Sequence, residues 1–316
     1  MARRRLLDGG RRARRYVRRL ERGDPRPPIP PPLPAGRIVD VPGRGEVFVR
    51  QSDGPPGAPT VLLLHGWTAS ADLNWWRAYD AVGGLASVVA VDHRGHGRGM
   101  RSEEPFTLEA AADDAAGVVR ALGLRSVIAC GYSMGGPISM LLWRRHPELV
   151  DALVFQATAL EWRASRRERL VWKTMGLLEY VLRLGAPRGM IDRLLRDAIE
   201  TSPDLAPYQG WLKGELRRGD PTDTAHAGRA LGGYDARPFA SEVDVPTAVV
   251  ITTEDRLVRP RKQRALAKAV PGATVHQLRG DHDACLVSGR DFARVTATAI
   301  DDVISRLPPR PTVDRR

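Results

Sequence analysis

The sequence predicts an α/β fold, in which helices cover both faces of a mostly parallel, eight-stranded sheet, and two observations carry this prediction. From residue 37 onward, short runs rich in Val, Ile, Leu and Ala alternate with longer stretches of helical apolar spacing. The later runs are continuously apolar, which is typical of strands buried on both faces. The strands are expected at 37–41, 47–52, 60–64, 87–92, 126–130, 152–158, 247–253 and 273–278.

Helices are expected between and after these strands. The last one shows the periodicity most clearly, because its apolar residues recur every three or four positions and so share one face. Ser288 stands immediately before it, at a position where a side chain can cap the helix. The four clearest helical stretches are 108–122, 134–145, 260–269 and 288–306.

One segment, residues 160–238, contains no strand-like run and carries amphipathic helical patterns instead. Ligands of open α/β sheets bind at the carboxyl ends of the strands, so an all-helical insertion between two strands is expected to form a lid there. Its apolar side chains have two interpretations, because they either line an acyl pocket or pack the lid onto the core. They are Trp162, Leu170, Trp172, Met175, Leu177, Leu178, Val181 and Leu182.

The positive charge of the chain is concentrated at its beginning. The formal net charge is +12, but residues 1–26 contain eleven arginines and only three acidic residues. The remaining 290 residues therefore carry only about +4, which does not indicate a nucleic-acid-binding surface.

The predicted domain organisation follows from these patterns. Residues 1–36 form a basic, proline-rich arm, 37–159 and 239–306 the core, 160–238 the lid and 307–316 a C-terminal tail. The arm has two interpretations. It is either a flexible, solvated segment, or a cationic helix with a thin apolar stripe that makes a peripheral contact with an anionic membrane.

The sequence favours a cytoplasmic location. No apolar run reaches the length of a membrane-spanning helix, and the arginines at the start are followed by a proline-rich stretch with no apolar signal region. Cys130 and Cys285 are far apart and indicate no disulfide framework.

A lone serine lies in the stretch "GYSMGG" at residues 131–136. Ser133 directly follows an expected strand and precedes an expected helix. The small residues Gly131 and Gly135 suit a sharp turn in which any Cβ would collide with the neighbouring strand or helix. Such a turn holds the serine in a strained backbone conformation that exposes its hydroxyl above the sheet, as a nucleophile requires.

A serine hydroxyl needs a base to remove its proton and an acid to orient that base. In this topology the order along the chain is serine, acid, histidine. Asp255 follows the strand 247–253 and His282 follows the strand 273–278, so they are the expected acid and base. The rival acids are Glu254, Asp281 and Asp283, and the rival histidines are His146, His226 and His276.

Acyl transfer also needs hydrogen-bond donors for the developing oxyanion. The backbone N–H of Met134, at the start of a helix, is one expected donor. The second is expected from the loop "HGWTAS" after the strand 60–64, where Gly66 allows close approach of the backbone and Trp67 supplies its N–H. His65 is expected to brace this loop and not to transfer a proton.

Five short motifs taken together resemble the α/β-hydrolase superfamily, of the esterase, lipase and proline-iminopeptidase-like kind with a helical lid. They are "HGW" at 65–67, "DHRGHG" at 92–97, "GYSMGG" at 131–136, "EDRLV" at 254–258 and "DHD" at 281–283. The resemblance covers about residues 37–306. It implies that Ser133 is the nucleophile, Asp255 the acid and His282 the base, with no metal and no cofactor.

The same resemblance gives the stretch 92–97 a structural role in a turn. The small hydroxylated residue that usually follows "RGHG" is replaced here by Arg98 and Gly99. This departure leaves the conformation of that loop open.

The residue type at position 133 restricts the chemistry. Relatives that form alkyl-enzyme esters need a carboxylate there, so a serine predicts an acyl-enzyme route. The expected substrate is a hydrophobic carboxylic ester, a small molecule such as a monoacylglycerol or a medium-chain ester. A thioester, a carbon–carbon bond beside a carbonyl, or peracid formation would use the same machinery, and a non-catalytic membrane-associated binder is the competing class.

Overall fold

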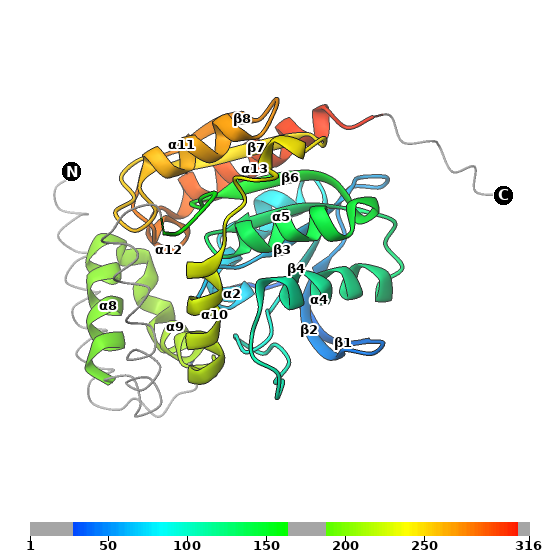
Figure 1. The fold of residues 1–316 in the computed structure, drawn as a ribbon. Coiled ribbons are helices and arrows are strands. Elements are labelled where there is room, and N and C mark those ends of the chain that lie inside the picture. Colours follow the sequence, from blue (N-terminus) through cyan, green and yellow to red (C-terminus); the bar gives the residue numbers. More distant parts are fainter. Residues whose placement is uncertain (1–27, 164–187, 309–316) are drawn as a thin grey trace.

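The computed structural model describes residues 28–163 and 188–308, and its centre is one eight-stranded sheet (Figure 1). The strands are β1 (Ala35–Val41), β2 (Gly45–Ser52), β3 (Thr60–Leu64), β4 (Ser87–Val91), β5 (Val127–Tyr132), β6 (Val150–Gln156), β7 (Thr247–Thr252) and β8 (Thr274–Leu278). Their order across the sheet is β1-β2-β4-β3-β5-β6-β7-β8. The predicted mostly parallel sheet of eight strands is therefore confirmed.

The topology of the sheet places a crevice beside β3. β1, β2 and β4 pair antiparallel, whereas β4, β3, β5, β6, β7 and β8 pair parallel. The chain passes from β3 to β4 on one side of β3 and then returns to β5 on the other side. At such a switch point the loops after the two strands diverge and leave space for a ligand at the carboxyl ends.

Helices cover both faces of the sheet, and each face has its own apolar cluster. The side chains of Leu62 and Leu64 belong to the cluster under α4, α5 and α11, whereas Val61 and Leu63 belong to the cluster under α3 and α13. This alternation follows from the two-residue period of a strand. The helices are α3 (Tyr79–Gly83), α4 (Leu108–Ala121), α5 (Gly135–Arg145), α11 (Pro260–Ala269) and α13 (Gly289–Ser305).

The structure differs from the predictions at several element ends. β8 is not buried on both faces, because it lies at the sheet edge and exposes Val275 to 49%. β6 ends at Gln156, two residues before the predicted end, because Ala157 has a positive φ of 49°. Ser288 stands before α13 as predicted, but its hydroxyl makes no cap and instead donates to the carbonyl of Arg279.

The chain joins the folded body before residue 37. β1 begins at Ala35, Pro31 is buried, and Leu33 packs against the apolar clusters. Arg50 also donates a hydrogen bond to the carbonyl of Pro34. The part of the predicted arm from residue 31 onward therefore lies on the core, while residues 1–27, which carry the basic stretch and its predicted membrane contact, lie outside the described residues.

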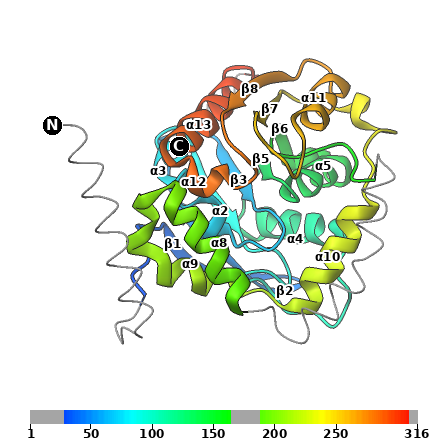
Figure 2. The ribbon, with the colours of Figure 1, turned by 90° about the vertical axis from the view of Figure 1, so that its left-hand side faces the viewer.

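The predicted insertion, residues 160–238, leaves and re-enters the core at one place. Glu161 and Asp235 form an isolated bridge, and the N–H of Ala236 donates to the carbonyl of Leu160. Between these ends the described residues form α8 (Arg188–Thr201), a 3-10 turn (Pro203–Tyr208), α9 (Gln209–Leu216) and α10 (Pro221–Gly233), which Figures 1 and 2 show gathered at one end of the sheet.

The described helices of the insertion meet the core at three elements: α9 contacts α2 (Ala71–Trp75), α10 contacts α4, and α8 contacts α12 (Ala284–Val287). Leu73 of α2 is buried among apolar side chains of the insertion, including Trp211 and Leu212 of α9. Of the eight apolar residues predicted to face the pocket or the core, Trp162 is buried against the core, and the other seven lie outside the described residues. In the described parts of the chain, no helix has the length and apolar character needed to cross a membrane.

Three buried histidines support the loops after β3 and β4. His65 and His93 have ring centroids 4.2 Å apart, and those of His65 and His96 are 5.6 Å apart. The Nε2 atom of His65 accepts the backbone N–H of His93 at 3.0 Å, so this nitrogen carries no proton and the ring is neutral. His65 thus braces the loop, as its position in the sequence predicted.

Burial disfavours the charged form of all three rings. It lowers the pKa of His65 well below its ordinary value, that of His93 to about 3 and that of His96 to about 4. The neighbouring Asp92 shifts the opposite way, because burial raises the pKa of its carboxyl to about 6. The folded state therefore keeps the three imidazoles neutral at neutral pH, while the Asp92 carboxyl takes up its proton only below about pH 6.

We expect this cluster to weaken the folded state in acid. Below about pH 6.5 the unfolded chain protonates three imidazoles that the folded chain keeps neutral to about pH 4. Asp92 has the opposite effect on stability. Below about pH 6 its carboxyl binds a proton in the folded state, whereas in the unfolded chain it binds one only at lower pH. The net uptake of about two protons lowers the free energy of unfolding by about 3 kcal/mol per pH unit as the pH falls.

Urea unfolding at pH 7.0, 6.0 and 5.0 measures this slope. The variant His96→Gln keeps a donor for the carbonyl of Arg94, with which the ring nitrogen Nδ1 is paired, and removes one titrating group. Its slope should be shallower by about 1.4 kcal/mol per pH unit. Equal slopes for the two proteins would contradict the assignment of a neutral, buried imidazole at this position.

Candidate active site

The turn between β5 and α5 holds Ser133 in a left-handed backbone conformation, with φ at 52°. The glycines on either side are sterically required. A Cβ on Gly131 would lie 2.1 Å from the carbonyl oxygen of Gly135, and one on Gly135 would lie 2.0 Å from that of Leu64. The turn is therefore compressed between the strand β3 and the helix α5 in a way that only glycine allows at these two positions.

Backbone hydrogen bonds hold this strained residue in place. The N–H of Ser133 donates to the carbonyl of Gln156 on β6 at 2.8 Å, and its own carbonyl accepts the N–H of Gly136 at 3.0 Å. A non-glycine residue in this conformation costs roughly 1–3 kcal/mol, which the surrounding contacts must offset. The other such residues among those described, Thr68 and Ala157, follow β3 and β6 at the same edge of the sheet.

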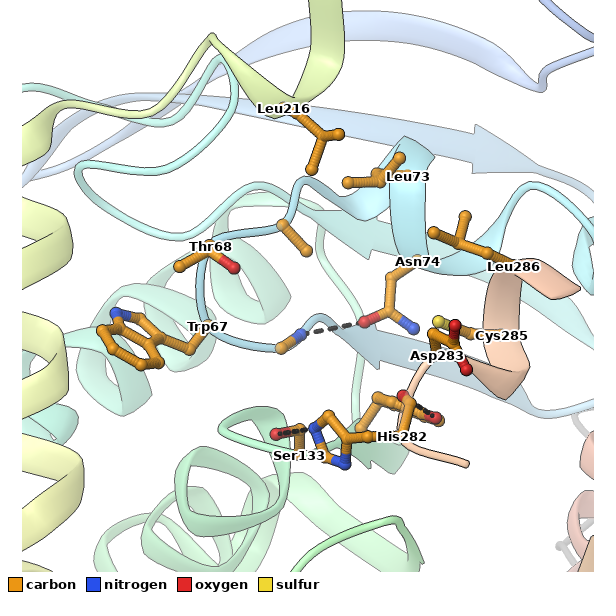
Figure 3. Close-up of a pocket in the computed structure, with 13 residues that line it drawn as sticks. Trp67, Thr68, Leu73, Asn74, Ser133, Leu216, His282, Asp283, Cys285 and Leu286 are labelled. Carbon is orange, nitrogen blue, oxygen red and sulfur yellow. Dashed lines mark hydrogen bonds between the residues drawn. The ribbon is translucent and has the colours of Figure 1, made fainter. Parts of the chain in front are cut away.

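His282 connects the serine to a carboxylate. Its Nε2 lies 3.0 Å from the Oγ of Ser133 (Figure 3). Its Nδ1 lies 2.8 Å from the Oδ2 of Asp255. A carboxylate only accepts, so Nδ1 carries the ring proton and Nε2 is left to accept the serine proton. The structure thus brings together the three residues that the sequence analysis selected, from loops 149 positions apart in the case of Ser133 and His282.

Asp255 is buried with no arginine or lysine paired to it among the described residues, and hydrogen-bond donors stabilise its charge instead. Its Oδ1 accepts the backbone N–H groups of Leu257 and Val258 at 2.9 and 2.7 Å. Besides the imidazole, its Oδ2 accepts the hydroxyl of Thr252 at 2.8 Å and the amide of Gln263 at 3.2 Å. Five donors on one carboxylate fix its orientation and keep it a strong acceptor for His282.

Three supporting residues were not found from the sequence. Gln263 on α11 braces Asp255, the hydroxyl of Tyr132 donates to the carbonyl of His282 at 2.8 Å, and Asn74 on α2 accepts the N–H of Gly66 at 3.0 Å. Only Tyr132 had a sequence signal, because it adjoins the serine.

The loop after β3 lies directly against the serine. A Cβ on Gly66 would be 3.3 Å from the Cβ of Ser133, so glycine permits this approach. The indole N–H of Trp67 donates to the carbonyl of Thr224 on α10 at 2.6 Å, which ties the loop to the insertion. Met134 is the N-cap residue of α5, so its backbone N–H lies at the positive end of that helix dipole.

The rival residues from the sequence analysis are occupied elsewhere. Glu254 pairs with Arg279 at the surface, and the side chain of Asp281 pairs with Arg256. His146 contacts Asp113 at the end of α5 away from Ser133, His276 contacts Asp302 on α13, and His226 lies on α10. Asp283 lines the cavity described next but does not contact the imidazole of His282 by a hydrogen bond in the described structure.

A cavity of about 160 Å³ opens beside Ser133 and His282 (Figure 3). Its wall is mainly apolar, and it includes the only side chain from the insertion among the described lining residues, Leu216. The other lining residues are Gly66, Trp67, Thr68, Ala69, Leu73, Asn74, Tyr132, Asp283, Cys285 and Leu286. A reactive hydroxyl therefore faces an apolar space bounded by residues of the core and of α9.

Comparison with known proteins agrees with this geometry. The profile of the family described as alpha/beta hydrolase fold matches residues 59–288. The pimeloyl-[acyl-carrier protein] methyl ester esterase of Neisseria meningitidis (serogroup A) is 26% identical over 279 residues, which cover 83% of this chain and 87% of that protein.

Solved structures show the same fold. The enol-lactonase from Burkholderia xenovorans LB400 superposes with a TM-score of 0.71 at 23% identity, covering 84% of this chain and 100% of that one. An esterase from Exiguobacterium antarcticum gives a TM-score of 0.72 at 18% identity with the same coverage of both chains. With its sheet order, its helices on both faces and the match over residues 59–288, this chain belongs to the α/β-hydrolase fold family and is a hydrolase of that superfamily.

Proposed function

We propose that this protein is a serine hydrolase that cleaves small hydrophobic carboxylic esters through an acyl-enzyme intermediate. The single observation that carries the proposal is the continuous hydrogen-bonded chain from the Ser133 hydroxyl through His282 to Asp255, at 3.0 and 2.8 Å. The esterase named above as a relative supports the choice of an ester as substrate.

In the first half of the reaction, the Ser133 Oγ attacks the ester carbonyl carbon while its proton passes to the Nε2 of His282. Asp255 stabilises the imidazolium that forms. The tetrahedral intermediate then collapses, the imidazolium gives its proton to the departing alkoxide, and the alcohol leaves. The acyl group remains bonded to Ser133.

In the second half, water replaces the alcohol. His282 takes a proton from the water as its oxygen attacks the acyl carbon, and it returns that proton to the Ser133 oxygen when the acid is released. The backbone N–H groups of Met134 and Trp67 are the proposed donors to the oxyanion in both halves. One such donor is typically worth roughly 2.7–4 kcal/mol of transition-state stabilisation.

The size of the cavity restricts the acyl group. Its volume of about 160 Å³ is close to that of the roughly 150 Å³ apolar cavity that accommodates benzene in another protein. The open cavity that the described residues line therefore takes an apolar group of about six carbon atoms. Short- and medium-chain acyl esters fit this space better than long-chain ones.

Removing the nucleophile tests the proposal directly. The wild-type protein should react covalently with a fluorophosphonate probe and hydrolyse p-nitrophenyl hexanoate, and Ser133→Ala should lose both activities. Ser126→Ala is the matched control, because this hydroxyl contacts Asp151 far from the cavity. Labelling of Ser133→Ala at the wild-type level would refute the proposal.

The role of Asp255 as the acid is tested by substituting it and, separately, the neighbouring Glu254. Asp255→Asn leaves a side chain of the same size but favours the wrong imidazole tautomer, so kcat should fall by about 10⁴-fold. Glu254→Gln changes the adjacent residue, whose surface pair with Arg279 has no part in the site, and should stay within about twofold of wild type. Similar losses in both variants would show that Asp255 has no special role.

The carboxylate of Asp283 on the cavity wall predicts discrimination by charge. Partial burial and the nearby Asp281 raise the pKa of this carboxyl, and in its ionised form it repels anionic substrates. Because the side chain is partly solvated, the repulsion is worth about 1 kcal/mol. Asp283→Asn should therefore raise kcat/KM for the monoester of a dicarboxylic acid about fivefold relative to p-nitrophenyl hexanoate.

Asp301→Asn, which removes an exposed carboxylate on α13, is the control for the change in net charge. It should leave the ratio between the anionic and neutral substrates unaltered. If both variants shift the ratio equally, the effect comes from overall charge and not from the cavity wall.

A further inference from the structure

Glu215 is a carboxylate of the insertion that is buried against the core. Its side chain has no exposed surface, although it lies on α9 near the end of that helix. Its oxygens accept both terminal nitrogens of the Arg98 guanidinium, at 2.6 and 3.1 Å, and the hydroxyl of Ser70 at 2.7 Å. Arg218 adds a further bond at 2.8 Å. Such a set of donors holds the carboxylate in one orientation.

Arg98, the residue that departs from the family pattern, is the centre of this contact. Besides Glu215, its guanidinium lies 3.2 Å from Asp72 on α2, and its backbone N–H donates to Asp92 at 2.7 Å. Its charge also lies over the ring of Phe48, 5.1 Å from the centroid. One guanidinium thus joins the loop after β4 to α2 and to α9.

Ser70 connects the same pair to the wall of the cavity. While its hydroxyl donates to Glu215, its oxygen accepts the N–H of Leu73 at 3.1 Å and so caps α2. Leu73 lines the cavity, and Asn74 next to it holds the N–H of Gly66 in the loop beside the serine. The position of Glu215 is therefore coupled to one apolar wall of the cavity through α2.

A second residue of this wall, Leu216, follows Glu215 directly in the chain. Leu216 is the last residue of α9, and Figure 3 shows its side chain beside Leu73, at the side of the cavity away from Ser133. Leu216 itself is only partly buried and packs against the apolar cluster that contains Leu73. Its position depends on the backbone that Glu215 fixes.

We propose that Leu216 sets the upper limit of acyl-chain length in the proposed ester site, and that the buried Arg98–Glu215 pair is the positioning element that holds it there. This inference rests on the proposed function. A buried ion pair gives little net stability compared with apolar packing, but it defines one geometry. Here that geometry fixes the distance between the end of α9 and α2.

We therefore expect the acyl chain of an accepted substrate to end at the wall formed by Leu216 and Leu73. Replacing leucine by alanine removes three carbon atoms from the wall, so acyl chains longer by about three methylenes should be accepted. Each methylene that a pocket gains or loses changes kcat/KM by roughly 10-fold or more. The limit is thus testable without knowledge of the natural substrate.

The experiment measures kcat/KM for p-nitrophenyl esters from butanoate to decanoate. In wild type, kcat/KM should decline beyond about six carbons. Leu216→Ala should raise the ratio of nonanoate to hexanoate at least about 10-fold. Glu215→Gln, which keeps the size and removes the charge, and Arg98→Lys, which keeps the charge and removes the bidentate contact, should each raise it about threefold. The ratio within one variant does not depend on its folded fraction.

Leu212→Ala is the matched control, because it shortens a leucine of the same helix that is buried but does not line the cavity. It should lower the melting temperature and leave the ratio unchanged. An unchanged ratio in Leu216→Ala, or an equal shift in Leu212→Ala, would overturn the assignment of Leu216. A shift in Leu216→Ala without one in Glu215→Gln and Arg98→Lys would overturn the role of the pair.

Fluorophosphonate labelling of wild type separates these results from failure of the proposed function. If Ser133 is not labelled and no ester in the series is hydrolysed, the proposed function fails and the inference fails with it. If Ser133 is labelled and esters are hydrolysed, the chain-length ratios alone decide whether Leu216 and the pair have the proposed roles.

Discussion

The left-handed backbone at Ser133 is the constraint on which the rest of the site depends. It requires glycine on both sides, because the carbonyl oxygens of Gly135 and Leu64 lie within 2.1 Å or less of where a Cβ would stand on the two flanking glycines. The conformational strain costs only a few kcal/mol. The packing of a sheet that is buried on both faces offsets this cost. The turn is confined between β3 and α5, which fixes where the Ser133 hydroxyl points. The loops that carry His282 and Gly66 lie next to this hydroxyl.

The site stabilises charge with dipoles and not with opposite charges. Asp255 has five hydrogen-bond donors and, within the described parts of the chain, no paired arginine or lysine, so its negative charge is available to stabilise a developing imidazolium. A guanidinium in the same place would satisfy the carboxylate but weaken that stabilisation. The cluster around His65 follows the same principle, since burial keeps its rings neutral beneath the loop that carries Gly66.

Much of this arrangement was predictable from the sequence, because the features concerned depend on residues that are close together in the chain. Strands buried on both faces are continuous apolar runs, and the turn at Ser133 requires glycines at fixed offsets, so β3, β5 and β7 and the serine could be predicted from short windows. The edge strand β8 was misjudged because burial depends on what packs beside a strand. Gln263, Asn74 and the Arg98–Glu215 pair were missed because their partners are 8 to 117 positions away, and a polar residue on a helix has the same sequence signature whether it faces water or a buried carboxylate.

The buried charges at α2 show why such a pair occurs next to a cavity. Asp72, Asp92 and Glu215 have fully buried side chains, and Arg50 and Arg98 are their main cationic partners. Removing these groups from water costs several kcal/mol per ion, and apolar side chains of similar volume would recover most of the stability. Apolar packing, however, is non-directional, so a helix held only by Leu212 and Trp211 could slide against α2 at little cost. A bidentate contact cannot slide without breaking, and this difference makes the insertion a fixed wall at α9 and not a loosely packed cover.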